Sequence, residues 1–103
     1  MLVAVTRSAG SPDLRVEDAD NLRQFHVVAE DFDADTIGEA ISGAAAGEYA
    51  DGYAWIRRQF IEEAVVVRSA DWSKRFEEMI RFAKGKGWTS ADGQLIRAHV
   101  EWR

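Results

Sequence analysis

The stretch QLIRAHVEW, residues 94–102, alternates apolar and ionisable side chains along its length. Such alternation is typical of a β-strand with one face in a core, because successive side chains of a strand point to opposite faces. The segment therefore predicts a strand with one buried and one polar face. The predicted buried face consists of Ile96, Ala98, Val100 and Trp102. The predicted polar face consists of Leu95, Arg97, His99 and Glu101.

Shorter apolar patterns earlier in the chain predict further strands. Three segments are rich in β-branched, aromatic and other apolar side chains, namely residues 1–5 (MLVAV), 24–30 (QFHVVAE) and 53–56 (YAWI). Between the first two of these, SAGSPD at 8–13 contains the only proline and predicts a turn. Residues 14–22 are expected to form a short edge strand followed by a loop.

The segment ADWSKRFEEMIRFAKG, residues 70–85, has the period of an amphipathic surface helix. Its apolar stripe consists of Trp72, Phe76, Met79, Ile80 and Ala83. We expect Ser69 or Asp71 to cap its start, and a basic last turn followed by glycine to end it. Phe82 lies at the flank of the stripe, where it would contact a neighbouring element or a partner chain.

Residues 36–39 (TIGE) match the capping box, in which a threonine hydroxyl accepts the N3 amide and a glutamate reaches back to the cap amide. Asp33 and Asp35 precede it, where the positive end of the helix dipole favours negative charge. An alanine-rich helix is predicted to begin here and to stop at Gly47. Several acids of HVVAEDFDAD, residues 26–35, thus have a structural interpretation.

The polar stretch EYADG at 48–52 is expected to be a break between this helix and the next strand. Two interpretations of RRQFIEEAVVV, residues 57–67, are open. As a helix it pairs Arg58 with Glu62 at i,i+4, and as a strand it would use its β-branched end. We expect a helix that ends near residue 65.

Strands and helices are interleaved along the chain, and 103 residues are long enough for one core. We therefore predict a single α+β domain over residues 1–103. Its expected architecture is a two-layer sandwich, in which a mixed or mainly antiparallel sheet of about four strands carries three helices on one face. A fully parallel sheet is disfavoured because its strands would be apolar on both faces.

The composition excludes several classes of protein. Apolar residues are 47% and charged residues 30%, which is typical of a globular chain and not of a disordered one. The absence of cysteine excludes disulfides, thiolate zinc sites and a cysteine nucleophile, and it fits a cytoplasmic protein. No run approaches the roughly 20 apolar residues of a membrane helix, so no membrane partner is expected.

The two halves of the chain differ in charge. Residues 1–52 contain eleven Asp and Glu against three Arg, a net charge of −8. Residues 53–103 contain ten Lys and Arg against seven Asp and Glu, a net charge of +3. The halves could meet between two copies of the chain or pack together within one monomer. Because the acidic half would repel phosphate, nucleic acid is not an expected partner.

Metal and cofactor motifs are incomplete. Asp31, Asp33 and Asp35 match the first positions of a calcium loop, but the glycine and the bidentate glutamate that must follow are absent. His26 and His99 are the only histidines, too few for a zinc or iron site without further ligands. Phosphate-binding and nucleophile-elbow motifs are also missing. We expect no metal and no cofactor.

The least ordinary feature is the row formed by Arg97, His99 and Glu101 on the polar face of the last strand. In such a row arginine could bind a carboxylate, histidine could transfer a proton and glutamate could fix its tautomer. The simpler interpretation is a solvated or interface-facing strand with cross-strand ion pairs. Further candidates for ligand binding are Tyr53, Trp55, Trp88 and His26.

We expect a small binding or assembly domain that self-associates, as a homodimer, or binds another protein. The alternative is a small cofactor-independent enzyme, of isomerase, cyclase or hydrolase type, that acts on an anionic metabolite through Arg97, His99 and Glu101. Convergence of these side chains in an enclosed pocket would favour the enzyme, and an open face would favour binding.

Overall fold

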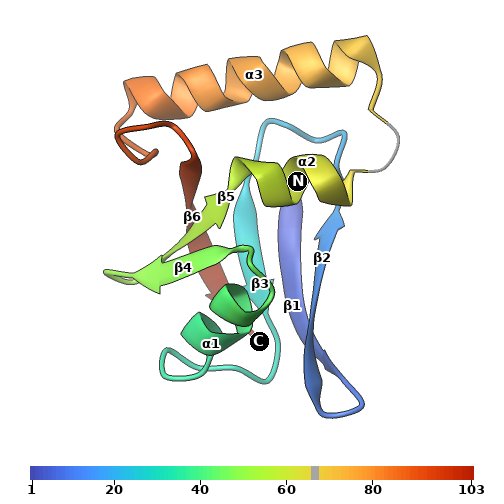
Figure 1. Cartoon of the computed structure of the whole chain (residues 1–103), viewed down its shortest axis with the longest axis vertical. Helices are drawn as coiled ribbons and strands as arrows, with labels where there is room; N and C mark the ends of the chain where they lie inside the picture. Colours follow the sequence, from blue (N-terminus) through green and yellow to red (C-terminus); the bar gives the residue numbers. More distant parts are fainter. Residues whose placement is uncertain (66–67) are drawn as a thin grey trace.

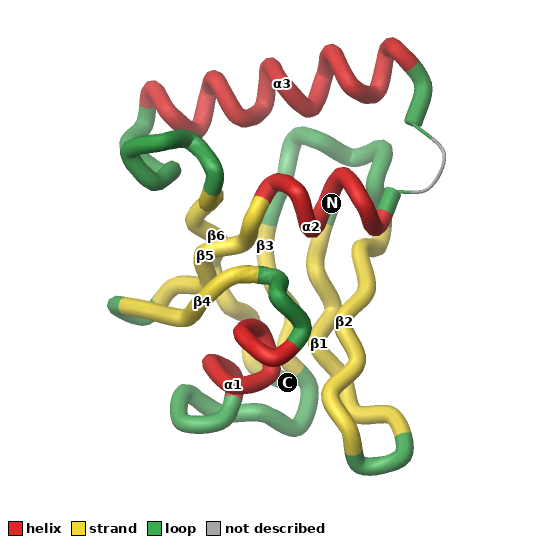
Figure 2. Tube along the Cα trace, in the orientation of Figure 1, coloured by secondary structure: helices red, strands yellow, loops and turns green. Residues whose placement is uncertain are grey.

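The computed structural model describes residues 1–65 and 68–103, which form a curled sheet with helices against its inner side and across one end (Figure 1). The strands are β1 (Leu2–Ser8), β2 (Ser11–Glu17), β3 (His26–Ala29), β4 (Gly47–Ala50), β5 (Tyr53–Arg57) and β6 (Leu95–Trp102). The helices are α1 (Ile37–Gly43), α2 (Arg58–Ala64) and α3 (Ala70–Gly85). Figure 2 shows the three helices and the loops that join them to the sheet. The predicted α+β class is confirmed.

The strands form one sheet in the order β2-β1-β3-β6-β5-β4. β3 lies between β1 and β6 and is parallel to both, whereas the other neighbouring pairs are antiparallel. Ala4 and Val28, which point away from the core, are also buried, as is typical of parallel strands in the middle of a sheet. The sheet therefore has more strands than the four expected, and it curls instead of forming one flat layer of a sandwich.

Strand β4 is the element that the sequence pattern did not predict, because it lies in the stretch expected to be a polar break. It forms a hairpin with β5 through Asp51 and Gly52, both with positive φ. Gly47, which begins β4, has a φ of 148°, and a Cβ there would lie 1.8 Å from the carbonyl oxygen of Trp55. Gly47 thus permits close approach of two strands. Its predicted role as the helix stop is wrong, since α1 already ends at Gly43.

The start of α1 also differs from the expected capping box. Thr36 is the N-cap residue, but its side chain makes no capping hydrogen bond. Instead, the carboxylate of Asp33 accepts hydrogen bonds from the Thr36 hydroxyl, the Thr36 amide and the Asp35 amide, each at 3.0 Å. The hydrogen bonds from Thr36 are the main reason that the pKa of Asp33 is lowered. An aspartate turn therefore takes the place of the capping box.

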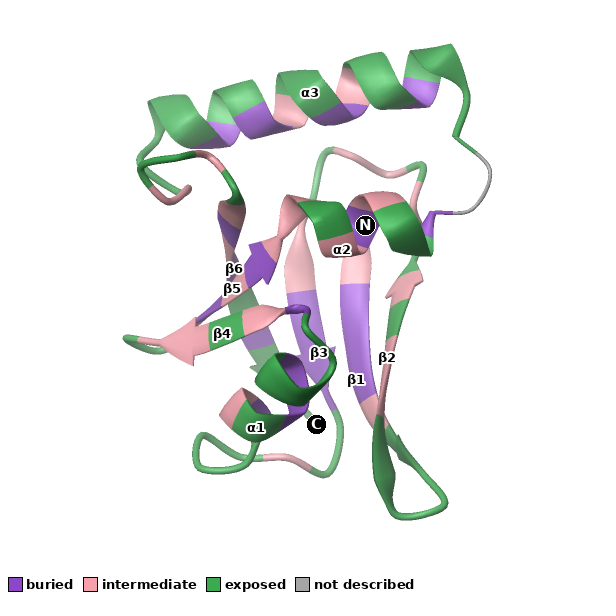
Figure 3. Ribbon diagram, viewed as in Figure 1, coloured by how far each residue is buried: buried purple, intermediate pink, exposed green. Residues whose placement is uncertain are grey.

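The core lies between the inner face of the sheet and the helices, and Figure 3 shows the buried side of each helix turned toward the sheet. Inner-facing core residues of the sheet are Val3, Val5, Val27, Ala29, Ala54, Ile56, Ile96, Ala98 and Val100. The helices contribute Ile37, Ala40, Ile41, Ile61, Trp72, Phe76, Ile80 and Ala83. The predicted buried stripe of α3 is confirmed except at Met79, which is only partly buried.

Helix α3 has the predicted bounds, and the Ser69 hydroxyl caps it by accepting the Trp72 amide at 3.0 Å. The helix lies across the end of the sheet at which β6 begins (Figure 1). It is tied to the loop before β3, because the Trp72 indole donates to the Ala19 carbonyl at 2.8 Å and Arg75 donates to the Asp20 carbonyl at 3.0 Å. These bonds fix the position of that loop relative to the helix.

The helix predicted to end near residue 65 is present as α2, and Arg58 pairs with Glu62 at 2.8 Å as expected. Arg58 also pairs with Glu77 of α3 and so joins the two helices. The hydrogen bond to Glu77, followed by those to Glu62, raises the pKa of Arg58. The β-branched end of the predicted segment, residues 66 and 67, lies outside the described residues.

Strand β6 has the predicted alternation, and Ile96, Ala98 and Val100 are buried. Trp102, however, is 44% exposed, so the prediction that it is buried is wrong. It is the last residue of β6, where its ring packs edge-on against Tyr49 of β4 with centroids 6.1 Å apart. The strand alternation is correct, but the last inward-facing residue of the strand is only partly covered.

Candidate functional site

The face of the sheet opposite the core, called the outer face below, carries the side chains that the sequence singled out. Within the described residues, the buried side chains of all three helices belong to the core on the inner face. Trp55 of β5 is the cross-strand partner of Arg97, and His26 of β3 is the partner of His99. Alternation along each strand puts two more candidates on this face. The outer-face candidates are Tyr53, Trp55, His26, Arg97, His99 and Glu101, with Trp88 beside them.

Trp88 reaches this face through backbone pairing at the start of β6. Thr89 forms an isolated antiparallel bridge with Ile96, and the Arg97 amide donates to the Trp88 carbonyl at 2.7 Å. β3 pairs only with the second half of β6, so this short segment occupies the vacant place beside the first half. Trp88 is 39% exposed. The pairing brings the Trp88 ring next to the Arg97 side chain.

A tight turn precedes β6 and sets this arrangement. The Asp92 carboxylate accepts the Ser90 hydroxyl at 2.6 Å and the Gln94 amide at 3.0 Å. The Ser90 hydrogen bond is the main cause of a lowered pKa for Asp92, because the bond stabilises the charged carboxylate. The Ser90 hydroxyl in turn accepts the Leu95 amide at 3.0 Å. A sequence-local hydrogen-bond network therefore positions Trp88 and the first residues of β6.

The Arg97 guanidinium rests on two aromatic rings. Its central carbon lies 4.3 Å from the centroid of the Tyr53 ring and 6.0 Å from that of the Trp88 ring. Within residues 1–65 and 68–103, no carboxylate lies within ion-pair distance of Arg97. The aromatic rings hold the cation by cation–π contact and leave its N–H donors available to an external carboxylate.

The two histidines are neighbours in the sheet, but they do not form an enclosed site. His26 Nε2 lies 3.9 Å from the Glu101 carboxylate, which also lies 3.6 Å from the Arg103 guanidinium. His99 is exposed. The row Arg97, His99 and Glu101 therefore lies on an open surface.

The Trp55 side chain is held near the hairpin that joins β4 to β5. Its indole N–H donates to the Ala50 carbonyl at 3.3 Å, and the residue is half-buried. Tyr53, two residues earlier, is also half-buried beneath Arg97. The aromatic part of the outer face is thus supplied by β5 and by the segment before β6.

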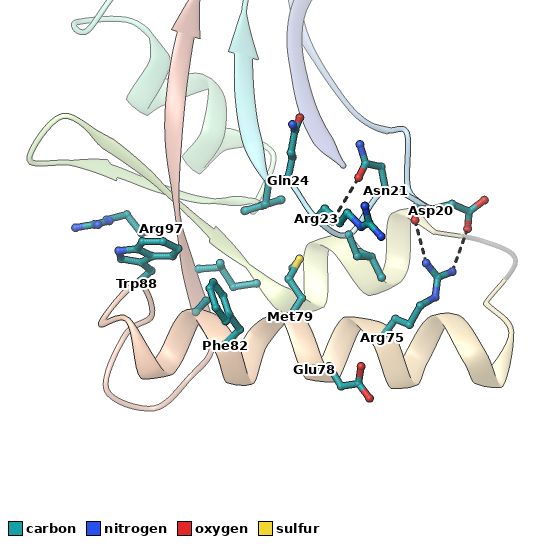
Figure 4. Close-up of a pocket in the computed structure, with 14 residues that line it drawn as sticks. Asp20, Asn21, Arg23, Gln24, Arg75, Glu78, Met79, Phe82, Trp88 and Arg97 are labelled. Atoms are coloured by element: carbon teal, nitrogen blue, oxygen red, sulfur yellow. Dashed lines mark hydrogen bonds and ion pairs between the residues drawn. The ribbon is translucent and has the colours of Figure 1, made fainter.

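A cavity of about 660 Å³ adjoins the outer face at Trp88 (Figure 4). It lies between α3, the segment 20–25 and the start of β6. Only Trp88 and Arg97 of the predicted site residues line it. Leu22 and Phe25 also line it, and the sequence analysis did not identify them as site residues. Leu22 lies in the predicted loop, and Phe25 was expected to belong to the strand over 24–30, whereas β3 begins only at His26.

Metal-ligating side chains do not gather on these surfaces. Over residues 1–65 and 68–103, no group of three or more His, Asp or Glu side chains is placed to hold a metal ion. None of the helices in the same part of the chain is both long and apolar enough to cross a membrane.

Comparison with protein-family models, with curated proteins and with solved structures gave no match to this chain. The interpretation of the outer face and of the cavity therefore depends on their own geometry and chemistry.

Proposed function

We propose that this chain is a binding and assembly domain that docks its outer face against the same face of a second copy. The observation that carries the proposal is the cluster of Arg97, Tyr53 and Trp88 on the face opposite the core. Protein interfaces are enriched in tyrosine, tryptophan and arginine, and these residues dominate their binding energy. The outer face therefore has the composition of an interface more than that of an ordinary solvated sheet.

The edges of the sheet are poor places for another chain to pair. Edge strand β2 contains Pro12, which has no amide hydrogen, and it carries the charged side chains of Asp13, Arg15 and Glu17. Proline and charge on an edge strand both discourage strand addition. The opposite edge strand, β4, has only four residues. These features support association through the outer face and not through an edge.

The charges along β6 are self-complementary, which is the reason for choosing a second copy as the partner. Consider a two-fold axis that lies in the plane between two facing sheets and is perpendicular to the β6 strands. The axis passes between the His99 residues of the two copies. Arg97 of each copy would then oppose Glu101 of the other, and symmetry would produce two such ion pairs. A uniformly acidic or basic partner would satisfy only one end of the row.

The charge difference between the two halves of the chain does not carry this proposal. β3, from the acidic half, pairs with β6, from the basic half, within one chain. The halves are therefore parts of one sheet and do not form two separate surfaces. The local order of charges on β6 is what matters.

The alternative function, a cofactor-independent enzyme, has less geometric support. His99 is exposed, and neither it nor Glu101 lines the 660 Å³ cavity. Acid–base catalysis gains from a site that excludes water and holds the base against its substrate. An open row of charged side chains supports recognition more than proton transfer.

Sedimentation equilibrium of the whole chain tests the proposal. We expect a dimer at tens of micromolar that dissociates on dilution. High salt should weaken it, because salt screens the attraction between the charged side chains of the two copies. A chain that stays monomeric throughout this concentration range at low salt would overturn the proposal.

A further inference from the structure

The cavity beside α3 has the size and the walls of a small-molecule site. Its volume of about 660 Å³ falls within the range of about 300 to 1,000 Å³ typical of ligand pockets. Its apolar walls come from three separate parts of the chain. These wall residues are Leu22 and Phe25 before β3, Met79 and Phe82 of α3, and Ile96 of β6.

The cavity accounts for an otherwise unexplained exposed ring. Phe82 is 61% exposed and lies at the flank of the core stripe of α3. Figure 4 shows Phe82 and Met79 extending from α3 toward the segment 20–25. The Phe82 ring packs edge-on against Trp88, with centroids 6.1 Å apart. A bound apolar group would cover this ring and lie between the helix and the loop.

Among the arginines that line the cavity, Arg23 differs from Arg75 and Arg97 in its contacts. The Arg97 guanidinium lies over two aromatic rings and extends away from the cavity (Figure 4). Arg75 donates to the Asp20 carbonyl at 3.0 Å and pairs with Asp71 at 3.0 Å, so it is already engaged. The Glu78 side chain points away from the cavity (Figure 4). Arg23 also lines the cavity. Within the described residues it has neither a carboxylate within ion-pair distance nor an aromatic ring beneath it.

We propose that this cavity binds an amphipathic carboxylate, with an apolar chain or ring against the Met79 and Phe82 walls and its anionic group at Arg23. A small polar anion would leave the apolar walls in water. An amphipathic cation would place its charge beside an unpaired guanidinium. A ligand with both an apolar body and one negative group matches both features. The site does not require the proposed dimer, although Trp88 borders both surfaces.

Decanoate, decylamine and decanol provide a matched set of probes, because they share a ten-carbon chain and differ in head group. We would titrate each into the ¹⁵N-labelled chain, below the concentrations at which they form micelles, and follow the amide resonances. Decanoate should bind and shift residues 21–25, 79–83 and 88. Decylamine should bind about tenfold more weakly, because a favourable charge contact is replaced by repulsion.

Two substitutions distinguish binding at a specific site from nonspecific hydrophobic binding. Arg23→Gln should weaken decanoate binding about threefold to fivefold and leave decanol binding unchanged. The matched control is Arg81→Gln, which removes an exposed arginine on α3 that does not line the cavity. Phe82→Glu should abolish decanoate binding without unfolding the chain, since this side chain is largely exposed.

Three results would overturn the proposal. These are an absence of decanoate binding, equal affinity for decylamine and decanoate, and decanoate-induced shifts confined to residues outside the cavity. None of them depends on whether the chain dimerises, so failure here and failure of the assembly proposal can be told apart.

Discussion

The guanidinium carbon of Arg97, on β6, lies 4.3 Å from the centroid of the Tyr53 ring on the neighbouring strand β5. The ring holds the cation flat against the sheet and reduces the side-chain entropy that a docking partner would otherwise have to overcome. Arg97 is thus presented in a fixed position with its N–H donors directed to solvent or to a partner. This pair is the centre of the outer face that we propose as a dimer interface.

Trp55→Ala should weaken self-association by about tenfold or more, because truncating a tryptophan at the centre of an interface commonly costs about 2 kcal/mol. Trp102→Ala is the matched control. Trp102 is exposed, and it lies on the other side of the sheet against Tyr49. Its removal should change the dimer dissociation constant less than about twofold, within ordinary surface effects. Equal effects in sedimentation experiments would place the interface elsewhere.

Gly47→Ala should destabilise the fold by about 3 kcal/mol or more, because the new Cβ would collide with backbone and the residue has a positive φ. The clash is with the Trp55 carbonyl oxygen. Gly43→Ala, at the end of α1, meets nothing within 4 Å and should be neutral or stabilising by about 0.5 to 1 kcal/mol. Urea unfolding measures both variants. A mild Gly47→Ala variant would contradict the close approach of β4 to β5.

Ser69→Ala should reduce stability by about 1 kcal/mol, because the hydroxyl accepts the Trp72 amide at the start of α3. Ser73→Ala, one turn into the same helix and exposed, should stay within about 0.5 kcal/mol of the original chain. Thermal unfolding of the two variants side by side measures the difference. If Ser73→Ala were the more harmful, the assigned cap would be incorrect.

Asp33→Ala should destabilise the chain at neutral pH, and the effect should shrink in acid. The folded pKa of Asp33 is lowered, mainly by hydrogen bonds from Thr36. A depressed carboxyl pKa contributes stability that is present above the unfolded pKa of about 4 and is lost as the pH falls through the folded value. Unfolding curves between pH 7 and the acid limit of folding measure this trend. A difference that grows toward low pH would have the wrong sign.

Local patterns in the sequence were sufficient to predict α3 and the alternation of β6. The apolar period, the Ser69 cap and the terminal glycine all act within a few residues, so neighbours along the chain decide them. The hydrogen bonds of Asp92, which set the turn before β6, also act within a few residues. In these elements the stabilising contacts are short-range, and pattern and structure agree.

Contacts outside the predicted segment account for the errors at β4 and Trp102, whereas a competing local contact accounts for the error at Thr36. Strand β4 contains glycine, glutamate and tyrosine and has no strand pattern of its own, because it is extended through pairing with β5. The capping box of Thr36 is a valid local solution, but Asp33 supplies a competing one. Trp102 lies on the expected side of the strand, yet it is 44% exposed, because the extent to which other elements cover this side chain is not encoded in the strand pattern.

The candidate site shows the same division. Alternation with period two placed Arg97, His99 and Glu101 on one face, and the sheet order brought Trp55 and His26 beside them. The cavity could not be predicted, because it depends on where segment 20–25 lies relative to α3. That placement is set by long-range hydrogen bonds of Trp72 and Arg75.

Charge reversal at both ends of the β6 row tests the central claim most directly. Arg97→Glu and Glu101→Arg would each place like charges opposite one another across the proposed two-fold axis, and each should weaken the dimer about tenfold or more. The double variant Arg97→Glu/Glu101→Arg restores opposite charges across the axis. Measured by sedimentation equilibrium at low salt, it should recover an affinity close to that of the original chain. A double variant as monomeric as either single one would contradict the account.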